Sequence, residues 1–452
     1  MQIAWIRFTC VALMFVISQA NARLEIQITK GMAAAVPIAV TPFEAKGFPS
    51  TEDIAQVVQD DLRMSGYFNP ISRGALPSGV GYGSIPIATW QTVGVENVVL
   101  GQVYESSPGR YSVRFELWDV FKGKEKSTPV VRQGELVVSQ STTSHVLLSK
   151  SFDNIPADQF RALAHHISDL VFEKLTGIRG AFSTRIAYVL ARDFRGGREY
   201  VLEIADVDGY NPKPLMKSTE PIMSPSWSPD GKRIAFVSFE NNRSQIYIAD
   251  VKTGERTRVS KFPGINGAPA WSPDGRKLAL VLSKEQNPNI YILDLVTRSM
   301  QQLTTGLNIS TEPSWSADGR RLLFTSNRGG KPQIYELDFG TMKTNRLTFQ
   351  GGYNARASYT PDRKSIVMIH QSDDGQYRIA RQSLENGELT YLTFARQDES
   401  PSVSPNGAMV LYGTQVGERG VLGVVSIDGR GQLRLPAREG SVQEPAWSPF
   451  LS

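Results

Sequence analysis

A 44-residue repeat runs through the C-terminal part of the sequence. Three similar copies of a Trp-Ser-Pro/Ala-Asp-Gly motif begin at Trp227, Trp271 and Trp315. Weaker copies continue at the same spacing, beginning at Tyr359, Val403 and Trp447. A fixed period of roughly 20–50 residues is typical of propellers, solenoids and other repeat architectures. This period constrains the fold more strongly than any other feature of the chain.

Each copy of the repeat contains four short apolar segments separated by turn residues. The first segment ends at the aromatic residue, and Ser-Pro-Asp-Gly follows it as a turn, because Pro presets φ and Gly tolerates positive φ. Segments such as Arg233–Phe236 and Ile246–Ile248 are then predicted to be strands. Gly, Pro and Asp interrupt every candidate helix, which excludes a helical repeat. Four strands in about 44 residues match one blade of a β-propeller.

The ends of the repeat array indicate how many blades there are. The second-strand segment occurs six times, first at Arg185–Tyr188 and last at Met409–Tyr412. No Trp strand precedes the first copy, and nothing follows the strand that ends at Trp447. We therefore predict an all-β, six-bladed β-propeller in which the C-terminal strand completes the first blade and closes the ring. The repeated Trp and Tyr residues are interpreted as packing between blades.

Residues 1–22 have the pattern of a secretory signal peptide. Arg7 is followed by the apolar run Phe8–Ser18, and Ala20-Asn21-Ala22 predicts cleavage between Ala22 and Arg23. The only cysteine, Cys10, lies inside this segment, so the mature chain contains no disulfide. Export without disulfides favours a bacterial periplasm.

The formal net charge of +5 is modest for 452 residues. It gives no support for nucleic-acid binding, which needs a concentrated basic face. The apolar run is also short for a membrane span. We expect a monomer that neither crosses a membrane nor binds nucleic acid.

Residues 23–178 lack the repeat and predict an α+β domain, and residues 179–452 form the propeller. Ser50 is expected to cap a helix that ends near Gly66, and a longer helix should run from about Ala157 to Leu175 and stop at Gly177. Strands are expected at Val36–Val40, Asn97–Tyr104 and Tyr111–Val120. The short connection at 177–183 predicts that the two domains are docked.

Catalytic motifs are missing from the sequence. It contains neither Gly-x-Ser-x-Gly nor His-Glu-x-x-His. His165 and His166 on the long helix are interpreted as surface or interdomain residues. We predict no catalytic activity, cofactor or metal ion. The alternative is a propeller enzyme acting on sugars or peptides, with His370 as its least poor catalytic candidate.

The residues three to five places before each repeat aromatic should surround one mouth of the central channel. They vary between copies, as expected of a binding surface on a rigid scaffold. The charged members are Glu312, Arg356, Asp398, Glu399 and Glu444. They predict an acidic mouth that binds basic side chains of a partner or a cation, or else a solvated loop surface.

Several segments resemble the TolB family of the periplasmic Tol-Pal system. They are His165-x-x-x-Asp169, the stretch from Glu173 to Val189, Asn266–Ala270, Thr311–Pro313, Asp398–Ser402 and Pro445–Pro449. The resemblance covers nearly the whole mature chain. It implies a non-enzymatic scaffold that supports outer-membrane invagination during cell division, outer-membrane integrity and protein transport.

The resemblance also implies partners and the residues that bind them. The lipoprotein Pal would bind the propeller mouth, where Ala268, Thr311 and Glu312 match positions linked to Pal. The family often has His where this chain has Ile265, so that contact must differ. TolA would bind the segment from Arg23 to about Ala34, and the residues expected to carry this contact are Leu24, Glu25, Ile26 and Ile28. Other outer-membrane or peptidoglycan-associated proteins and colicins are further expected partners.

Overall fold

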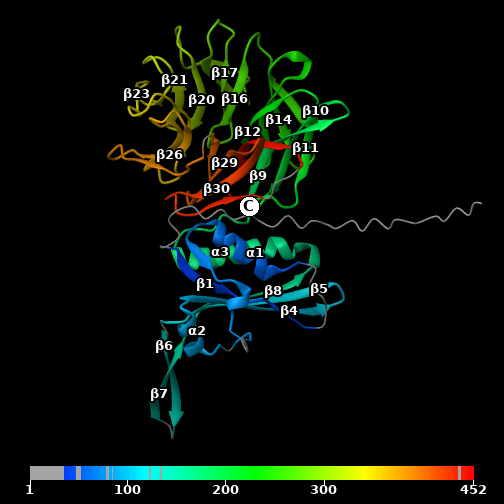
Figure 1. The fold of residues 1–452 in the computed structure, drawn as a ribbon, viewed down its shortest axis with the longest axis vertical. Helices are drawn as coiled ribbons and strands as arrows, with labels where there is room; N and C mark the ends of the chain where they lie inside the picture. The colour runs from blue at the N-terminus through cyan, green and yellow to red at the C-terminus, as the bar shows by residue number, and fades with distance from the viewer. Residues whose placement is uncertain are drawn as a thin grey trace, which may run out of the picture.

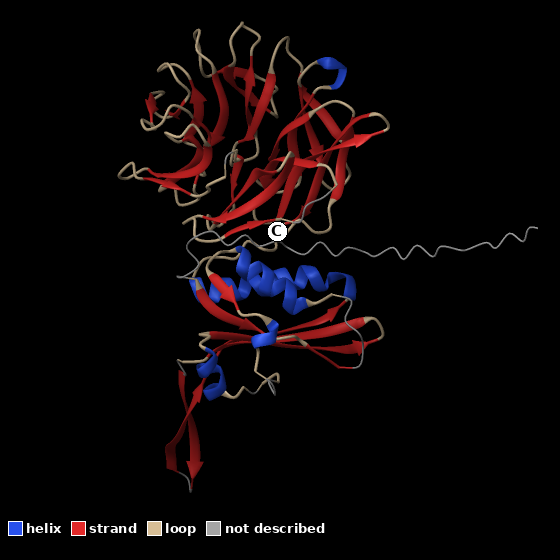
Figure 2. Cartoon of the chain, in the orientation of Figure 1, coloured by secondary structure: helices blue, strands red, loops and turns tan. Residues whose placement is uncertain are grey.

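The computed structural model describes residues 35–46, 52–77, 81–83, 85–121, 124–132, 135–395, 397–435 and 439–451. A ring of β-sheets lies above a layered domain of helices and strands (Figures 1 and 2). This arrangement confirms the predicted α+β domain followed by a propeller. The expected signal peptide, its cleavage site and the segment with Leu24, Glu25, Ile26 and Ile28 lie outside the described residues.

The N-terminal domain is built on a mixed sheet with strand order β3-β1-β4-β5-β8, and β2 pairs with β4. These strands are β1 (Val36–Val40), β2 (Glu44–Lys46), β3 (Phe68–Pro70), β4 (Asn97–Ser107), β5 (Arg110–Asp119) and β8 (Val146–Ile155). Helices α1 (Ile54–Met64) and α3 (Phe160–Thr176) lie between this sheet and the propeller (Figure 1). Helix α2 (Ile87–Val93) carries the fully buried Trp90. Strands β6 (Lys124–Arg132) and β7 (Glu135–Ser144) pair as a hairpin that projects from the domain (Figure 2).

The ends of the two long helices follow from local capping chemistry. The Asp53 carboxylate accepts a hydrogen bond from the Gln56 N–H at 3.0 Å, so Asp53, rather than the predicted Ser50, caps α1. Gly177 ends α3 as predicted, with φ of 74° and its N–H bonded to the Glu173 carbonyl.

The propeller consists of six four-stranded sheets. The first combines β9 (Arg185–Phe194), β10 (Gly197–Asp206) and β11 (Lys213–Ser218) with the C-terminal β32 (Ser441–Trp447). The second contains β12 (Ile222–Trp227), β13 (Arg233–Ser238), β14 (Gln245–Asp250) and β15 (Arg256–Ser260), and the third contains β16 (Asn266–Trp271), β17 (Lys277–Leu282), β18 (Asn289–Asp294) and β19 (Met300–Gln302). The fourth contains β20 (Ser310–Trp315), β21 (Arg321–Ser326), β22 (Gln333–Asp338) and β23 (Thr344–Arg346). The fifth contains β24 (Asn354–Tyr359), β25 (Ser365–Gln371), β26 (Tyr377–Ser383) and β27 (Leu389–Tyr391), and the sixth contains β28 (Glu399–Val403), β29 (Met409–Val416), β30 (Arg419–Ser426) and β31 (Gln432–Arg434). Short 3₁₀ turns occur at Arg73–Ala75, Ala157–Gln159 and Glu240–Asn242.

The C-terminal strand closes the ring as predicted. Strand β32 pairs antiparallel with β9, and Trp447 lies opposite Ile186. The Trp447 indole N–H donates to the Thr184 hydroxyl at 2.7 Å, and its backbone N–H donates to the Ser402 hydroxyl at 2.8 Å. One residue therefore joins the last strand both to the start of the propeller and to the sixth blade.

The other repeated tryptophans connect neighbouring blades. The indole N–H of Trp271 donates to the Ser226 carbonyl on the innermost strand of the preceding blade, at 3.1 Å. Trp227 and Trp315 make the equivalent bonds to Ala446 and Ala270, also at 3.1 Å. The packing interpretation of these residues is confirmed.

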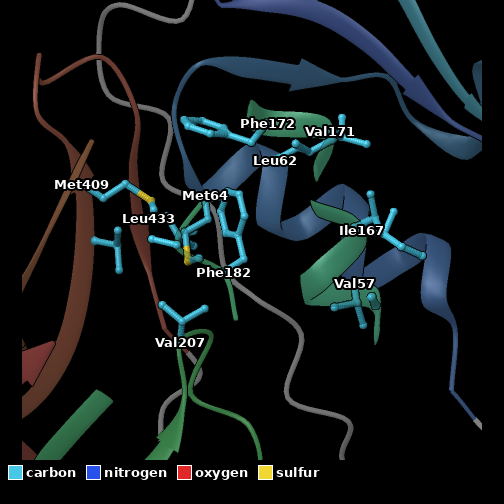
Figure 3. Close-up of a cluster of buried hydrophobic side chains, with 14 of the residues drawn as sticks. Val57, Leu62, Met64, Ile167, Val171, Phe172, Phe182, Val207, Met409 and Leu433 are labelled. Carbon is cyan, nitrogen blue, oxygen red and sulfur yellow. The ribbon is translucent and has the colours of Figure 1, made fainter. Parts of the chain in front are cut away.

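The two domains share one hydrophobic core, part of which Figure 3 shows. Phe172 of α3 and Phe182 of the connecting segment pack edge to face with ring centroids 5.6 Å apart. Met409 and Leu433 of the sixth blade belong to the same buried cluster. The predicted docking of the domains is therefore observed, and it depends on large apolar side chains from both.

Candidate binding site at the propeller mouth

A backbone irregularity recurs in the innermost strand of every blade. The pairing register shifts at a β-bulge, for example between Thr311 and Ser314. The residue three places before the repeat aromatic has a positive φ in each blade: Ser224 (50°), Ala268 (43°), Glu312 (54°), Arg356 (53°), Ser400 (52°) and Glu444 (54°). None is glycine, although a left-handed conformation costs other residues roughly 1–2 kcal/mol. Bulges re-aim side chains and are common next to functional sites.

These six positions surround one end of the central channel. A cavity of about 550 Å³ is lined by Ala268, Thr311, Glu312, Arg356 and Glu444, among other residues of the innermost strands. A second cavity of about 470 Å³ is lined by Trp227, Ser400, Trp447 and neighbouring Ser and Pro residues. Arg356 lines both cavities. Its side chain therefore lies where the mouth meets the deeper part of the channel.

Arg356 connects several blades through its guanidinium group. Nη2 lies 2.7 Å from Glu444 Oε2, and Nη1 donates to the Ser400 hydroxyl at 2.6 Å. Nε lies 3.7 Å from Glu312 Oε1. Burial alone would lower the pKa of Arg356, but the carboxylates of Glu444 and Glu312 raise it above its ordinary value. Burial likewise opposes ionisation of Glu444, yet Arg356 holds the pKa of Glu444 below its usual range.

Glu312 is held in place but stays accessible. Its Oε2 accepts hydrogen bonds from the Arg356 backbone N–H at 3.0 Å and from the Thr325 hydroxyl at 2.8 Å. The side chain is 26% exposed, whereas that of Glu444 is 11% exposed. Thr311 and Ala268 are also partly exposed. Glu312 is thus a fixed carboxylate that an incoming group can reach.

Glu399 is exposed and interacts with the charges of Glu444 and Arg356, although it does not itself line the mouth cavity. Partial desolvation and the nearby Glu444 raise its pKa, while Arg356 acts in the opposite direction. Arg356 offsets one of the three carboxylates of Glu312, Glu399 and Glu444, as the sequence suggested. The fourth expected carboxylate, that of Asp398, is buried away from the cavity, so the mouth is less acidic than predicted.

The structure corrects the predicted place of Asp398. This residue is only 1% exposed and does not line the mouth cavity, and Thr393 and Thr414 lie beside its carboxylate. Burial raises the pKa of Asp398. The β-bulge explains the error. Strand alternation alone would place positions five and three before the aromatic on the same face. The register shift that begins after Glu399 turns them apart, and position five is buried in the blade in every copy. The equivalent residues are Ile222, Asn266, Ser310, Asn354 and Val442.

Ser224 and Ser400 lie in the predicted mouth but were not chosen as site candidates, because they carry no charge. Ser400 accepts the Arg356 hydrogen bond, and the Ser224 backbone N–H donates to Glu444 at 3.3 Å. The sequence shows that both residues lie three places before the repeat residue. It does not show that this position has a left-handed backbone, which sets it apart from its neighbours.

The histidines do not contribute to this site. His370 is 2% exposed, its Nδ1 lies 2.8 Å from Asn354 Oδ1, and burial lowers its pKa. It lines neither of the two channel cavities. His166 is exposed, and His165 is buried between the domains, so the two point apart. The interdomain interpretation thus holds for His165 and the surface interpretation for His166.

No helix in the described part of the chain is long and apolar enough to cross a membrane.

Comparison with known proteins identifies one and the same family for both domains. Residues 24–126 match the family described as TolB amino-terminal domain, and residues 172–451 match the TolB beta propeller domain. A protein of Coxiella burnetii named Tol-Pal system protein TolB is 52% identical over 449 residues, which cover 98% of each chain. A Legionella pneumophila protein of the same name is 54% identical over 95% of this chain and 96% of its own. The crystal structure of TolB from Acinetobacter baumannii matches with a TM-score of 0.81 and 38% identity, covering 95% of this chain and 100% of that one.

Proposed function

The chain belongs to the TolB family, and on this premise we propose that it is a periplasmic, non-enzymatic scaffold of the Tol-Pal system. In this proposal the propeller mouth binds Pal and the mature N-terminal segment binds TolA. The two contacts together would support outer-membrane invagination at division and outer-membrane integrity.

The observation that carries the proposal is the ring of left-handed, non-glycine residues at the mouth. Six strained positions keep one backbone geometry, while their side chains differ from blade to blade. Strain that is retained at corresponding positions points to a functional constraint. A rigid frame with varied side chains around a cavity of about 550 Å³ suits recognition of a protein loop or helix end better than catalysis.

The charges of the mouth favour a partner that presents a basic or hydrogen-bond-donating group. Glu312 and Glu399 remain accessible, whereas Glu444 is engaged by Arg356. Glu312 is already oriented by Thr325 and by the Arg356 backbone. Little side-chain entropy would therefore be lost when a partner binds it.

The test is calorimetric titration of the mature protein with purified Pal. We expect Glu312→Arg to weaken binding at least tenfold, or about 1.4 kcal/mol, because it reverses the charge at the cavity. Glu255→Arg is the matched control, since Glu255 is exposed in the turn between β14 and β15, at the opposite end of the blade. If both variants bind Pal within a factor of two of the unchanged protein, the proposed Pal site is wrong.

The TolA contact is proposed from the alternating pattern of Leu24, Ile26 and Ile28, with Glu25 between them. Removing residues 23–34 from the mature protein should abolish TolA binding and leave Pal binding within twofold. Retained TolA binding would place that site elsewhere. Mass spectrometry of the protein isolated from periplasm tests cleavage between Ala22 and Arg23, because an uncleaved or cytoplasmic chain would contradict the proposed location.

A further inference from the structure

The interface between the domains has two chemically different ends along α3. The C-terminal end lies in the apolar cluster of Phe172, Phe182, Met409 and Leu433. It is also next to the covalent connection that follows Gly177. The N-terminal end carries Arg161 and His165, which meet the propeller through polar contacts.

The propeller contributes the turn between β10 and β11 to this polar end. Asp208 Oδ2 forms an ion pair with Arg161 Nη2 and lies 3.6 Å from His165 Nε2. The Arg161 guanidinium stacks on the Tyr210 ring at 3.6 Å from its centroid. Asp208 is 6% exposed, so this contact is largely shielded from solvent.

His165 lies between one carboxylate from each domain. Its Nδ1 is 2.8 Å from Asp61 Oδ2 of α1, and its Nε2 faces Asp208. Asp61, His165 and Asp208 are close enough together to resemble a metal site. However, the two carboxylates face opposite nitrogens of one ring, and Arg161 already pairs with Asp208. A doubly protonated imidazole explains the geometry better than an ion does.

The charges around His165 support this assignment. Burial would lower its pKa, but Asp61 and Asp208 raise it to about 9 against the opposing effect of Arg161. The charged or titratable groups that face this cluster are Asp60 and Asp61 from α1, Arg161 from α3, Glu52, and Asp208 with Tyr210 from the propeller. The ring is therefore charged at neutral pH.

We propose that the turn Asp208–Tyr210 is a releasable latch on α3, and that the segment 177–183 with its apolar cluster is the hinge about which the propeller swings when the latch opens. The difference between the two ends supports this assignment. Separating the apolar cluster exposes large buried side chains, which costs free energy in proportion to area. Separating a buried ion pair returns its charges to water, and that hydration offsets much of the lost attraction. The turn between β10 and β11 contributes one residue, Val207, to the apolar cluster, so opening the ionic end exposes less apolar surface than separating the C-terminal end and costs less free energy.

The lack of cysteine after Cys10 makes the latch measurable by spin labelling of the full mature chain. Asp158→Cys with Lys213→Cys reports across the latch, and Lys174→Cys with Arg430→Cys reports across the hinge; all four positions are exposed. Electron–electron double resonance gives the distance distribution of each pair. In the Asp208→Asn background we expect the latch pair to gain a longer-distance population above about 10%, with the hinge pair unchanged.

Matched variants separate the latch from a general loss of folding. Asp193→Asn removes an exposed carboxylate of the first blade and should leave both distributions unchanged. Tyr210→Leu keeps an apolar side chain but removes the stacked ring, and it should lengthen the latch distance in the same direction. Circular dichroism and thermal melting show whether each variant is folded. If folded Asp208→Asn and Tyr210→Leu both keep the unchanged distribution, the latch is refuted.

A pH series tests the role of His165. Between pH 7 and 10 the long population of the latch pair should grow in the unchanged protein as His165 loses its proton. In His165→Gln the long population should be present already at pH 7 and should not grow over this range. A pH response that persists in His165→Gln would overturn the assignment to His165.

Discussion

Replacing Trp447 tests whether the C-terminal strand holds the ring closed. The side chain is 6% exposed, and burying an indole removes roughly 200 Å² from water. At about 25 cal/mol per Å² this burial contributes about 5 kcal/mol, and the hydrogen bond to Thr184 adds about 1 kcal/mol. Measured costs of Trp→Ala in cores are about 3–5 kcal/mol. We therefore expect Trp447→Ala to lower the free energy of unfolding by about 4 kcal/mol.

The assay is urea unfolding combined with hydrogen exchange of the β9 amides. Trp271→Ala is the matched control, because Trp271 is 7% exposed and makes the corresponding indole bond in a blade that contains no chain end. Both variants should lose similar stability, but only Trp447→Ala should speed exchange in β9, whose partner strand is β32. Trp447→Phe should cost about 1–2 kcal/mol through the lost indole bond. A loss under about 1 kcal/mol in Trp447→Ala, with β9 still protected, would refute closure by this strand.

Three further predictions follow from particular residues, each measured by equilibrium unfolding. Ala268→Gly should stabilise the protein by about 0.5–1 kcal/mol. The strain of an alanine at φ of 43° costs more free energy than the extra chain entropy that glycine loses on folding. A destabilised variant would contradict this explanation. Gly431→Ala should destabilise the protein by about 1–3 kcal/mol, because a Cβ there would lie 2.3 Å from the Gly66 Cα across the domain interface. Gly74→Ala is the control and should be nearly neutral, because a Cβ at Gly74 would have no atom beyond its chain neighbours within 4 Å. A group whose pKa is raised on folding contributes stability that is present below its unfolded pKa and is lost as pH rises. His165, raised from 6.5 to about 9, should therefore contribute a loss of up to about 3 kcal/mol between those pH values, and that loss should be missing in His165→Gln.

The candidate site could be predicted only in part. The repeat spacing correctly located Glu312, Arg356 and Glu444 at the mouth, because a fixed period keeps equivalent residues at one level of the ring. The same reasoning placed Asp398 there as well, because spacing does not say which way a side chain turns. The bulge at each innermost strand aims position three before the aromatic at the channel and position five into the blade. The direction of neither side chain can be predicted from the amino-acid composition.

The sequence alone determined the architecture, an α+β domain followed by a six-bladed propeller. Periodic Trp, Pro, Asp and Gly impose turns and strands locally, and the two incomplete ends of the repeat predict closure by Trp447. Local rules suffice there because each blade repeats the same short-range chemistry. Tertiary structure decided everything that depends on pairs distant in sequence, such as Arg356 with Glu444 and His165 with Asp61 and Asp208. Their charge states arise from burial and from partners that only the folded chain brings together.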